Sequence, residues 1–107
     1  MKLVVAIINN DDCHAVLSEV THAGFSATKL STSGGFLRSG NVTLLMGVEE
    51  DRLEELMGII KEFSSKRKQF VTPTPSGMAE SFMSVPVEVT VGGATVFVLD
   101  VEEFYKL

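Results

Sequence analysis

The sequence has 107 residues, which is long enough for one domain and too short for two. Its hydrophobic fraction of 45% excludes a disordered chain, because so much apolar surface can offset the entropy lost on ordering. The formal net charge of −5 argues against general binding to nucleic acid, which needs a basic surface to neutralise phosphates. The longest apolar run, residues 3–8, is far shorter than the ~20 residues of a membrane-spanning helix. The single cysteine, Cys13, favours a reducing compartment and predicts a cytoplasmic protein without a membrane partner.

The first half of the chain predicts a strand, a helix and two further strands. Residues 3–8 are apolar at every position and rich in β-branched side chains, which is typical of a strand buried on both faces. Residues 9–12 supply helix N-cap candidates, and Gly24 ends the helix that follows. Residues 25–30 and 41–48 predict the second and third strands. The inner face of the helix is expected to consist of Cys13, Val16, Leu17, Val20 and Ala23.

The second half begins with an acidic first turn at residues 49–51, which opens a second helix. The basic run at residues 66–68 follows this helix, and a favourable interaction with its macrodipole explains such a run without a ligand. Residues 66–84 are polar and predict a long loop, which in a compact domain is usually functional or disordered. The inner face of this helix is expected to consist of Leu53, Leu56, Met57, Ile60 and Phe63.

The C-terminal part alternates between apolar and polar residues and predicts two paired strands. Residues 85–91 form the first, and residues 94–99 are expected to pair back with them. The Gly92-Gly93 pair between them is a hairpin-turn signal. Residues 101–107 predict a short helix or an extended arm.

The order of these elements predicts an α+β, ferredoxin-like fold, βαββαβ plus a C-terminal hairpin strand, as a single domain over residues 1–107. Right-handed crossovers place both helices on one face of the sheet, and the opposite face then has no cover. Because roughly 25 cal/mol is at stake per Å² of apolar surface, a second copy of the chain is the expected cover. The sequence therefore predicts a homo-oligomer.

The glycine-rich segment at residues 31–40 is the strongest candidate for ligand binding. Its glycines let a ligand approach backbone N–H groups, and the large apolar Phe36 and Leu37 can form a wall against a flat ring. Hydrogen-bonding and phosphate-binding candidates flank it, namely Thr28, Asn41, Lys29 and Arg38. The alternative is a structural loop in which the Phe–Leu pair packs on a neighbouring subunit, and spacing alone favours this alternative.

Nearly the whole chain resembles the PII-like cyclic-di-AMP receptor family. The resemblance is carried by residues 27–30, 34–38, 40–41, 87–89 and 91–98. It implies a cytosolic homotrimer of Gram-positive bacteria with PII-like, ferredoxin-like subunits and no catalytic activity. It also implies one cyclic-di-AMP in each cleft between neighbouring subunits, and no other cofactor. The family has a short loop after the second strand and a long one before the fourth, and both are thought to rearrange on binding; the downstream partner is unknown.

Site residues carry over from the resemblance position by position. Thr28 and Asn41 match polar positions around the adenine and ribose. The remaining ligand-binding positions are Ala27 beside Thr28, the pocket-wall residues Gly35, Phe36 and Leu37, the close-approach glycine Gly47, and Gly92 beside Gly93 near the cleft.

Two positions and the last residues depart from the family pattern: Ser26 stands where arginine is frequent, Gly24 stands where a relative can have asparagine, and the sequence ends in Lys106-Leu107 without a polar terminal side chain. Loss of a guanidinium beside a phosphate or an adenine costs roughly 1.5–3 kcal/mol, about one to two decades in affinity. The departures therefore predict that cyclic-di-AMP still binds, but more weakly, and that they affect the ligand site more than the fold and the trimer.

The alternative functions are a metal site, a PII-type module and a ferredoxin-like enzyme. Cys13, His14 and His22 diverge on the first helix and predict no metal site, although wider structural relatives include a divalent-cation-binding trimer. A PII-type module that binds ATP, ADP or another small anion remains an alternative. A haem- or quinone-handling ferredoxin-like monooxygenase is disfavoured by the aliphatic interior. No serine has a convincing His–Asp partner, so no catalytic residue is expected.

Overall fold

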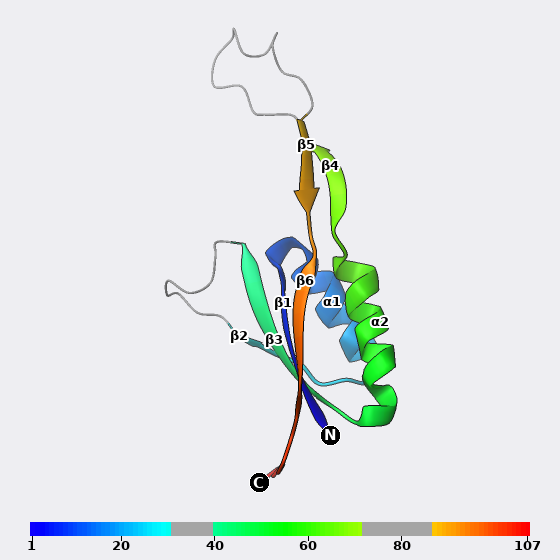
Figure 1. Ribbon diagram of the computed structural model, residues 1–107, viewed down its shortest axis with the longest axis vertical. Coiled ribbons are helices and arrows are strands. Elements are labelled where there is room, and N and C mark those ends of the chain that lie inside the picture. The colour runs from blue at the N-terminus through cyan, green and yellow to red at the C-terminus, as the bar shows by residue number, and fades with distance from the viewer. Residues whose placement is uncertain (31–39, 72–86) are drawn as a thin grey trace, which may run out of the picture.

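The computed structural model describes residues 1–30, 40–71 and 87–107. A four-stranded antiparallel sheet with strand order β2-β3-β1-β6 forms the body of the protein, and a separate two-stranded ribbon, β4-β5, extends from one end of it (Figure 1). The elements are β1 (Lys2–Asn9), α1 (Asn10–His22), β2 (Thr28–Leu30), β3 (Asn41–Val48), a 3₁₀ turn η1 (Glu50–Arg52), α2 (Leu53–Ser64), β4 (Arg67–Val71), β5 (Val87–Val91) and β6 (Ala94–Asp100).

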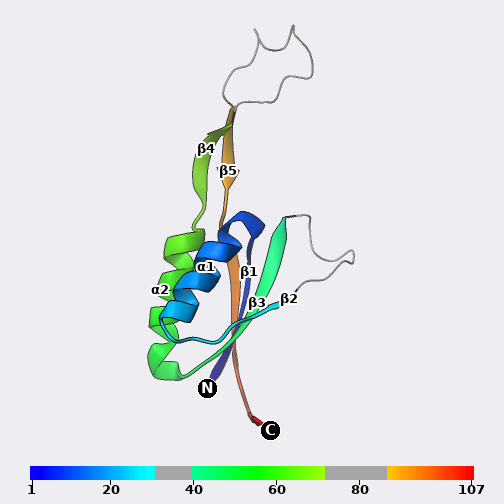
Figure 2. The ribbon, with the colours of Figure 1, turned by 180° about the vertical axis from the view of Figure 1, so that it is seen from behind.

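Both helices pack on the same face of the four-stranded sheet, as the two opposite views show (Figures 1 and 2). The central strand β1 turns every second side chain toward them, and Val4, Ala6 and Ile8 are fully buried there. The predicted helix faces are confirmed, because their central residues are buried and the flanking ones pack against the same cluster. The fully buried helix residues include Val16, Val20, Leu56 and Ile60.

The first four predicted elements are confirmed, with one shorter strand. The Asn9 side chain caps α1 by accepting a hydrogen bond from the Asp11 amide at 2.8 Å. Gly24, with φ +91°, follows the end of the helix as expected. The second strand was predicted over residues 25–30 but covers only Thr28–Leu30, because Phe25 turns into the hydrophobic core, where it is 7% exposed.

The face of the sheet away from the helices is apolar and uncovered. Its side chains from β1 are Leu3, Val5 and Ile7, which are only half-buried. On the neighbouring edge strand, Phe97 and Leu99 are 54% and 48% exposed. The expectation of a bare apolar face is therefore confirmed. The architecture is a mixed α+β domain with antiparallel sheets and two helices, compatible with a ferredoxin-like arrangement.

The predicted hairpin around Gly92 and Gly93 is wrong. Strand β5 pairs with β4, whereas β6 pairs with β1 and forms an edge of the main sheet. Both glycines have positive φ, +78° and +94°, although the strands on either side of them do not pair with each other. A turn signal, however, depends only on neighbouring residues and does not determine which strands pair. Strand β1 is apolar on both faces and pairs with β6. The extra strands are therefore β4 and β5, not a C-terminal hairpin strand.

The prediction of a continuous loop over residues 66–84 is also wrong at its start, because residues 67–71 form β4. Pairing with β5 makes this polar segment a strand, and a Lys68–Glu88 ion pair of 3.1 Å crosses the ribbon. Helix α2 ends at Ser64, so Arg67 and Lys68 lie beyond its last turn and the macrodipole does not explain them. Residues 72–84 lie outside the described part of the chain.

The C-terminal residues 101–107 form an extended arm and not a helix. The Val101 amide donates to the Met1 carbonyl at 3.2 Å, and beyond it Phe104 and Tyr105 are 62% and 71% exposed. In the described ranges, no helix is long and apolar enough to cross a membrane.

An ion pair ties the base of the ribbon to the body of the protein. Asp12, in the first turn of α1, is 5% exposed and accepts two hydrogen bonds from the Arg67 guanidinium, at 2.7 Å and 3.3 Å. This hydrogen bonding and the charge of Asp12 raise the pKa of Arg67. Arg67 also donates to the Ser65 carbonyl at 3.3 Å. A bidentate guanidinium–carboxylate pair fixes both distance and orientation, so it orients the ribbon relative to α1.

We expect Asp12→Asn to loosen the ribbon, because it removes the charge from a buried partner of Arg67. Thermal unfolding should show a Tm lowered by roughly 5 °C, and hydrogen exchange should accelerate in residues 67–71 and 87–91. The matched control is Asp11→Asn, an exposed carboxylate in the same helical turn with the same relation to the helix dipole. Equal effects of the two substitutions would contradict the proposed role of the ion pair.

Candidate ligand-binding site

Three of the predicted ligand-binding residues share the uncovered face of the sheet. Thr28 on β2 lies opposite Leu45 on β3, and Gly47 follows two residues later on the same face. Asn41 begins β3 on that face, opposite Asn9. Six residues separate Asn41 from Gly47, which is roughly 20 Å along a strand. The three residues therefore line the length of one sheet edge, as an extended ligand would require.

A small pocket of about 190 Å³ lies at the Gly47 end of this edge. Ser26 and Gly24, the two positions that depart from the family pattern, are among its lining residues. So is Arg52, whose guanidinium lies 4.1 Å above the Phe25 ring and donates to the Ala23 carbonyl at 2.7 Å. The pocket thus contains a guanidinium from η1 although residue 26 supplies none.

Arg52 is held in place on a second side as well. Its Nε and Nη2 donate to the Glu55 carboxylate at 3.1 Å and 3.0 Å. Together with the Phe25 ring, these contacts fix the plane of the guanidinium, and part of its charge is already neutralised by Glu55. Arg52 therefore forms part of the wall of the small pocket. Because its charge is partly neutralised, it attracts a distant anion only weakly. The sequence gives no sign that Arg52 lines this pocket, because no local pattern connects it to Ser26.

The other predicted site residues are distributed as follows. Lys29 pairs with Leu44, so its side chain lies on the opposite face of β2 from Thr28. Ala27 is half-buried just before β2. Gly35, Phe36, Leu37 and Arg38 lie outside the described residues.

Gly92 lies at the junction of β5 and β6, directly beside the Asp12–Arg67 ion pair. A Cβ atom at this position would lie 2.6 Å from Arg67 Nη1 and 2.7 Å from the Ser65 carbonyl oxygen. Its φ of +78° is also unfavourable for any residue with a side chain. Glycine is therefore required here by the ion pair itself. Its expected contact with a ligand stays a prediction.

Within one chain, Gly92 and Thr28 are far apart. They belong to opposite edges of the sheet, because β2 and β6 are the two edge strands and β3 and β1 lie between them. At about 4.8 Å per strand, the edges are roughly 14 Å apart. A single chain thus presents two separate parts of the predicted site.

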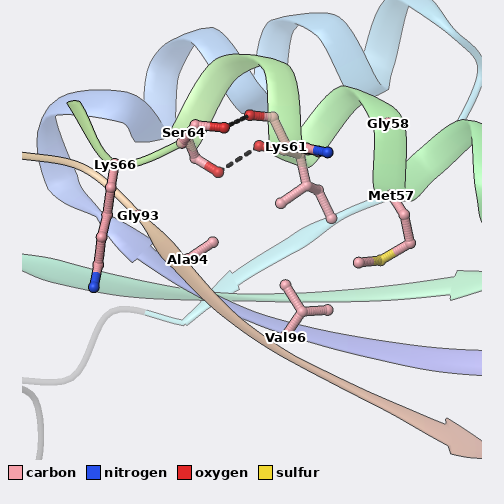
Figure 3. A pocket seen from close by; sticks show the side chains of 10 residues that line it. Met57, Gly58, Lys61, Ser64, Lys66, Gly93, Ala94 and Val96 are labelled. Atoms are coloured by element: carbon pink, nitrogen blue, oxygen red, sulfur yellow. Dashed lines mark hydrogen bonds between the residues drawn. The ribbon is translucent and has the colours of Figure 1, made fainter.

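A second recess, of greater volume than the first, lies beside Gly93 between α2 and β6 (Figure 3). It has a volume of about 480 Å³ and is called the α2–β6 pocket below. Its surface is mostly apolar, with two lysines at its margin. It is lined by Met57, Gly58, Ile60, Lys61, Ser64, Ser65, Lys66, Gly93, Ala94 and Val96. This volume falls in the range of small-molecule sites.

The sequence gives no sign of this pocket, because its walls come from α2 and β6, which are far apart in the chain. Gly58 lies inside α2, where glycine is less favourable than alanine. A Cβ at Gly58 would meet no other atom within 4 Å, so packing does not require the glycine.

Gly58→Ala should therefore stabilise the protein by about 1 kcal/mol, because it raises helix propensity without a clash. For a domain of this size, the expected rise in Tm is about 4–8 °C. Differential scanning calorimetry measures it, and a Tm equal to or below that of the wild type would show that Gly58 has a packing role.

The three metal-ligand candidates of α1 do not converge. Cys13 is buried in the hydrophobic core, and His14 and His22 are exposed. In the part of the chain that the structure describes, no three His, Cys, Asp or Glu side chains are grouped for metal binding.

These elements define the class as a small mixed α+β domain with a bare apolar sheet face and recesses at both edges of its main sheet. A sequence model of the cyclic-di-AMP receptor family matches residues 1–107, and the chain belongs to this family. A solved structure from Pediococcus pentosaceus ATCC 25745, titled as a functionally unknown protein, is similar, with a TM-score of 0.80 and 42% sequence identity. The match covers 99% of this chain and 96% of that chain.

Proposed function

We propose that this protein is a non-enzymatic cytosolic receptor that binds cyclic-di-AMP in clefts between the subunits of a homotrimer. Membership of the cyclic-di-AMP receptor family supports the ligand. The site residues are those assigned above on β2, β3 and the β5–β6 junction. Binding transmits a signal to a protein partner through rearrangement of the two loops that the family pattern singles out.

The uncovered apolar face of the sheet is the observation in favour of the homotrimer. It presents aliphatic and aromatic side chains from both central and edge strands, among them Leu3, Val5, Ile7, Phe97 and Leu99. Burial of each side chain of this size contributes about 1.5–3 kcal/mol. Contact with other copies of the same chain buries this face without a change in the fold.

The distribution of site residues between two sheet edges is the observation that carries the proposal. Thr28 and Gly47 lie at the β2–β3 edge, and Gly92 lies at the β6 edge, roughly 14 Å away. In a closed ring of subunits, the β2–β3 edge of one chain can face the β6 edge of the next. The two parts then complete one site, and each of three clefts contains one ligand.

The position of Gly92 connects the proposed ligand site to the β4–β5 ribbon. Gly92 contacts the Asp12–Arg67 ion pair, and this pair orients β4 and β5. A ligand that contacts Gly92 acts on the base of the ribbon. To signal, the ligand must bind one ribbon orientation more tightly than the other, since only differential affinity shifts an equilibrium.

Titration calorimetry with purified protein tests the ligand. We expect saturable heat with cyclic-di-AMP and one site per chain, and no comparable heat with cyclic-di-GMP. Addition of excess ATP before the titration checks the alternative PII-type site, and a divalent metal checks the metal-binding alternative. Absence of heat at high micromolar cyclic-di-AMP, or prior saturation by ATP, would refute cyclic-di-AMP as the ligand.

Phe97→Glu tests the assembly. A carboxylate at this position, on the β6 edge of the bare face, should convert the trimer to a monomer and abolish cyclic-di-AMP binding, because the cost of burying an unpaired charge exceeds the gain from apolar contact. Analytical ultracentrifugation measures the mass. Val98→Glu is the matched control, because Val98 is 43% exposed and its side chain lies on the other face of the same strand. A wild-type monomer, or a Phe97→Glu trimer that still binds, would contradict the inter-subunit site.

A further inference from the structure

Residues 102–107 form an arm that has no partner in the described part of its own chain. Its aromatic side chains Phe104 and Tyr105 are 62% and 71% exposed. The Val101 amide still donates to the Met1 carbonyl. Beyond this bond, residues 102–107 form no backbone hydrogen bond with any of residues 1–30, 40–71 and 87–107. Because ordering a chain segment costs conformational entropy, a fixed position of the arm requires a contact outside its own chain.

The edge of β3 at Gly47 lacks a partner strand. The Asn10 amide donates to the Gly40 carbonyl, directly opposite it in the β1–β3 register. In antiparallel strands, successive residues direct their backbone groups to opposite neighbours, so the odd-numbered residues of β3 direct theirs toward β2. Strand β2 pairs only with residues 43–45. The N–H and C=O groups of Gly47 therefore point to an edge where no described residue pairs with them.

The small pocket lies at this vacant edge. Phe25 turns into the core, so the chain joins the sheet only from Thr28 onward. The pocket volume of about 190 Å³ is below the roughly 300–1,000 Å³ of small-molecule sites, which favours a single side chain as its occupant. Arg52 lines the pocket, and its guanidinium already lies against the Phe25 ring. A planar guanidinium also stacks on a second ring, so an aromatic side chain suits this pocket.

The arm and the Gly47 edge lie at the same end of the sheet, away from the ribbon (Figure 1). Lys2 pairs with Val48 on β3 and with Asp100 on β6, so Gly47 and the start of the arm are level. They belong to opposite sides of the sheet, and within one chain the arm would have to cross β1 and β3 to reach the β2 side of Gly47. In the proposed ring, the β6 edge of one chain faces the β2–β3 edge of the next, which brings the arm of one copy beside Gly47 of the other.

We propose that residues 102–107 of one copy bind the Gly47 edge of β3 in the next copy, with Phe104 in the small pocket. This inference rests on the homotrimer of the proposed function and adds a contact that closes the ring. One arm residue pairs with both backbone groups of Gly47, which is the shortest form of strand addition. The Tyr105 hydroxyl donates to the Glu103 carboxylate within the arm at 3.1 Å, so the purely apolar Phe104 is assigned to the pocket.

The arm and a ligand approach Gly47 from different directions. The arm uses the backbone groups of this glycine at the edge of the strand. Gly47 lies opposite Leu3, on the bare face of the sheet, and this side of the glycine stays open to a ligand. The arm therefore strengthens the assembly without occupying the predicted cyclic-di-AMP contact.

Phe104→Ser tests the contact of the side chain. Each trimer loses three apolar contacts, so the protein concentration at which half of the trimer dissociates should rise by at least about tenfold. Sedimentation velocity over a dilution series measures this midpoint, and thermal unfolding confirms that the variant is folded. Phe70→Ser is the matched control, because Phe70 is 70% exposed on the ribbon and outside the proposed contact, and its midpoint should stay within about twofold of the wild type. Equal shifts in the two variants would overturn the inference.

A cross-link tests which copy the arm contacts. Ser26→Cys together with Tyr105→Cys places one thiol at the small pocket and one beside Phe104. A disulfide requires Cα atoms within about 7 Å, so mild oxidation of the double variant should give covalent trimers on a denaturing gel without reductant. Each single variant is the control and should migrate as a monomer, because the native Cys13 is buried in the core. A disulfide within one chain, or the absence of any cross-link in a trimeric double variant, would contradict the exchange of arms.

The failures of the two proposals are distinguishable. A trimeric wild type with an unchanged midpoint for Phe104→Ser overturns the inference and leaves the proposed function intact. A wild-type monomer overturns both. A trimer that forms the inter-subunit cross-link but gives no heat with cyclic-di-AMP overturns the proposed ligand and supports the arm contact.

Discussion

The central constraint on this protein is a sheet with two faces and helices for only one of them. The connections from β1 through α1 to β2, and from β3 through α2 toward the rest of the chain, place both helices on the same side (Figures 1 and 2). The residues of β1 nevertheless alternate between two apolar faces. Helices fully bury one face, with Val4, Ala6 and Ile8, and leave the other to be covered from outside the chain. The proposed trimer and its clefts depend on this asymmetry.

The junction between β5 and β6 connects three features that are distant in sequence. Gly92 approaches the Asp12–Arg67 ion pair, and Gly93 supports the aliphatic part of Lys66. The ion pair in turn joins the first turn of α1 to the first residue of β4. A two-stranded ribbon has little stability by itself, so its orientation depends on this base. A ligand near the junction therefore acts where small displacements alter the contact between ribbon and body.

An acidic chain can still have local groups of positive charge, and this protein has one. Most of its carboxylates are exposed, and several neutralise cations such as Lys2, Arg52 and Lys68. Lys61 and Lys66, at the margin of an apolar pocket, form no such pair with the carboxylates of residues 1–30, 40–71 and 87–107. Net charge governs long-range attraction, whereas affinity at a site depends on the few groups that contact the ligand. The lack of an arginine at position 26 therefore does not by itself determine how strongly the protein binds an anion.

The sequence by itself determined the two helices, the first and third strands and the apolar character of both sheet faces, because hydrophobic periodicity, caps and glycine stops are local signals. It also marked Gly92 and Gly93 as a break between two strands, although these strands do not pair with each other. It did not determine that β6 pairs with β1, that residues 67–71 become a strand, or that Asp12 meets Arg67. Only the tertiary structure decided these, together with the α2–β6 pocket, because strand partners and pocket walls depend on contacts between residues far apart in the chain.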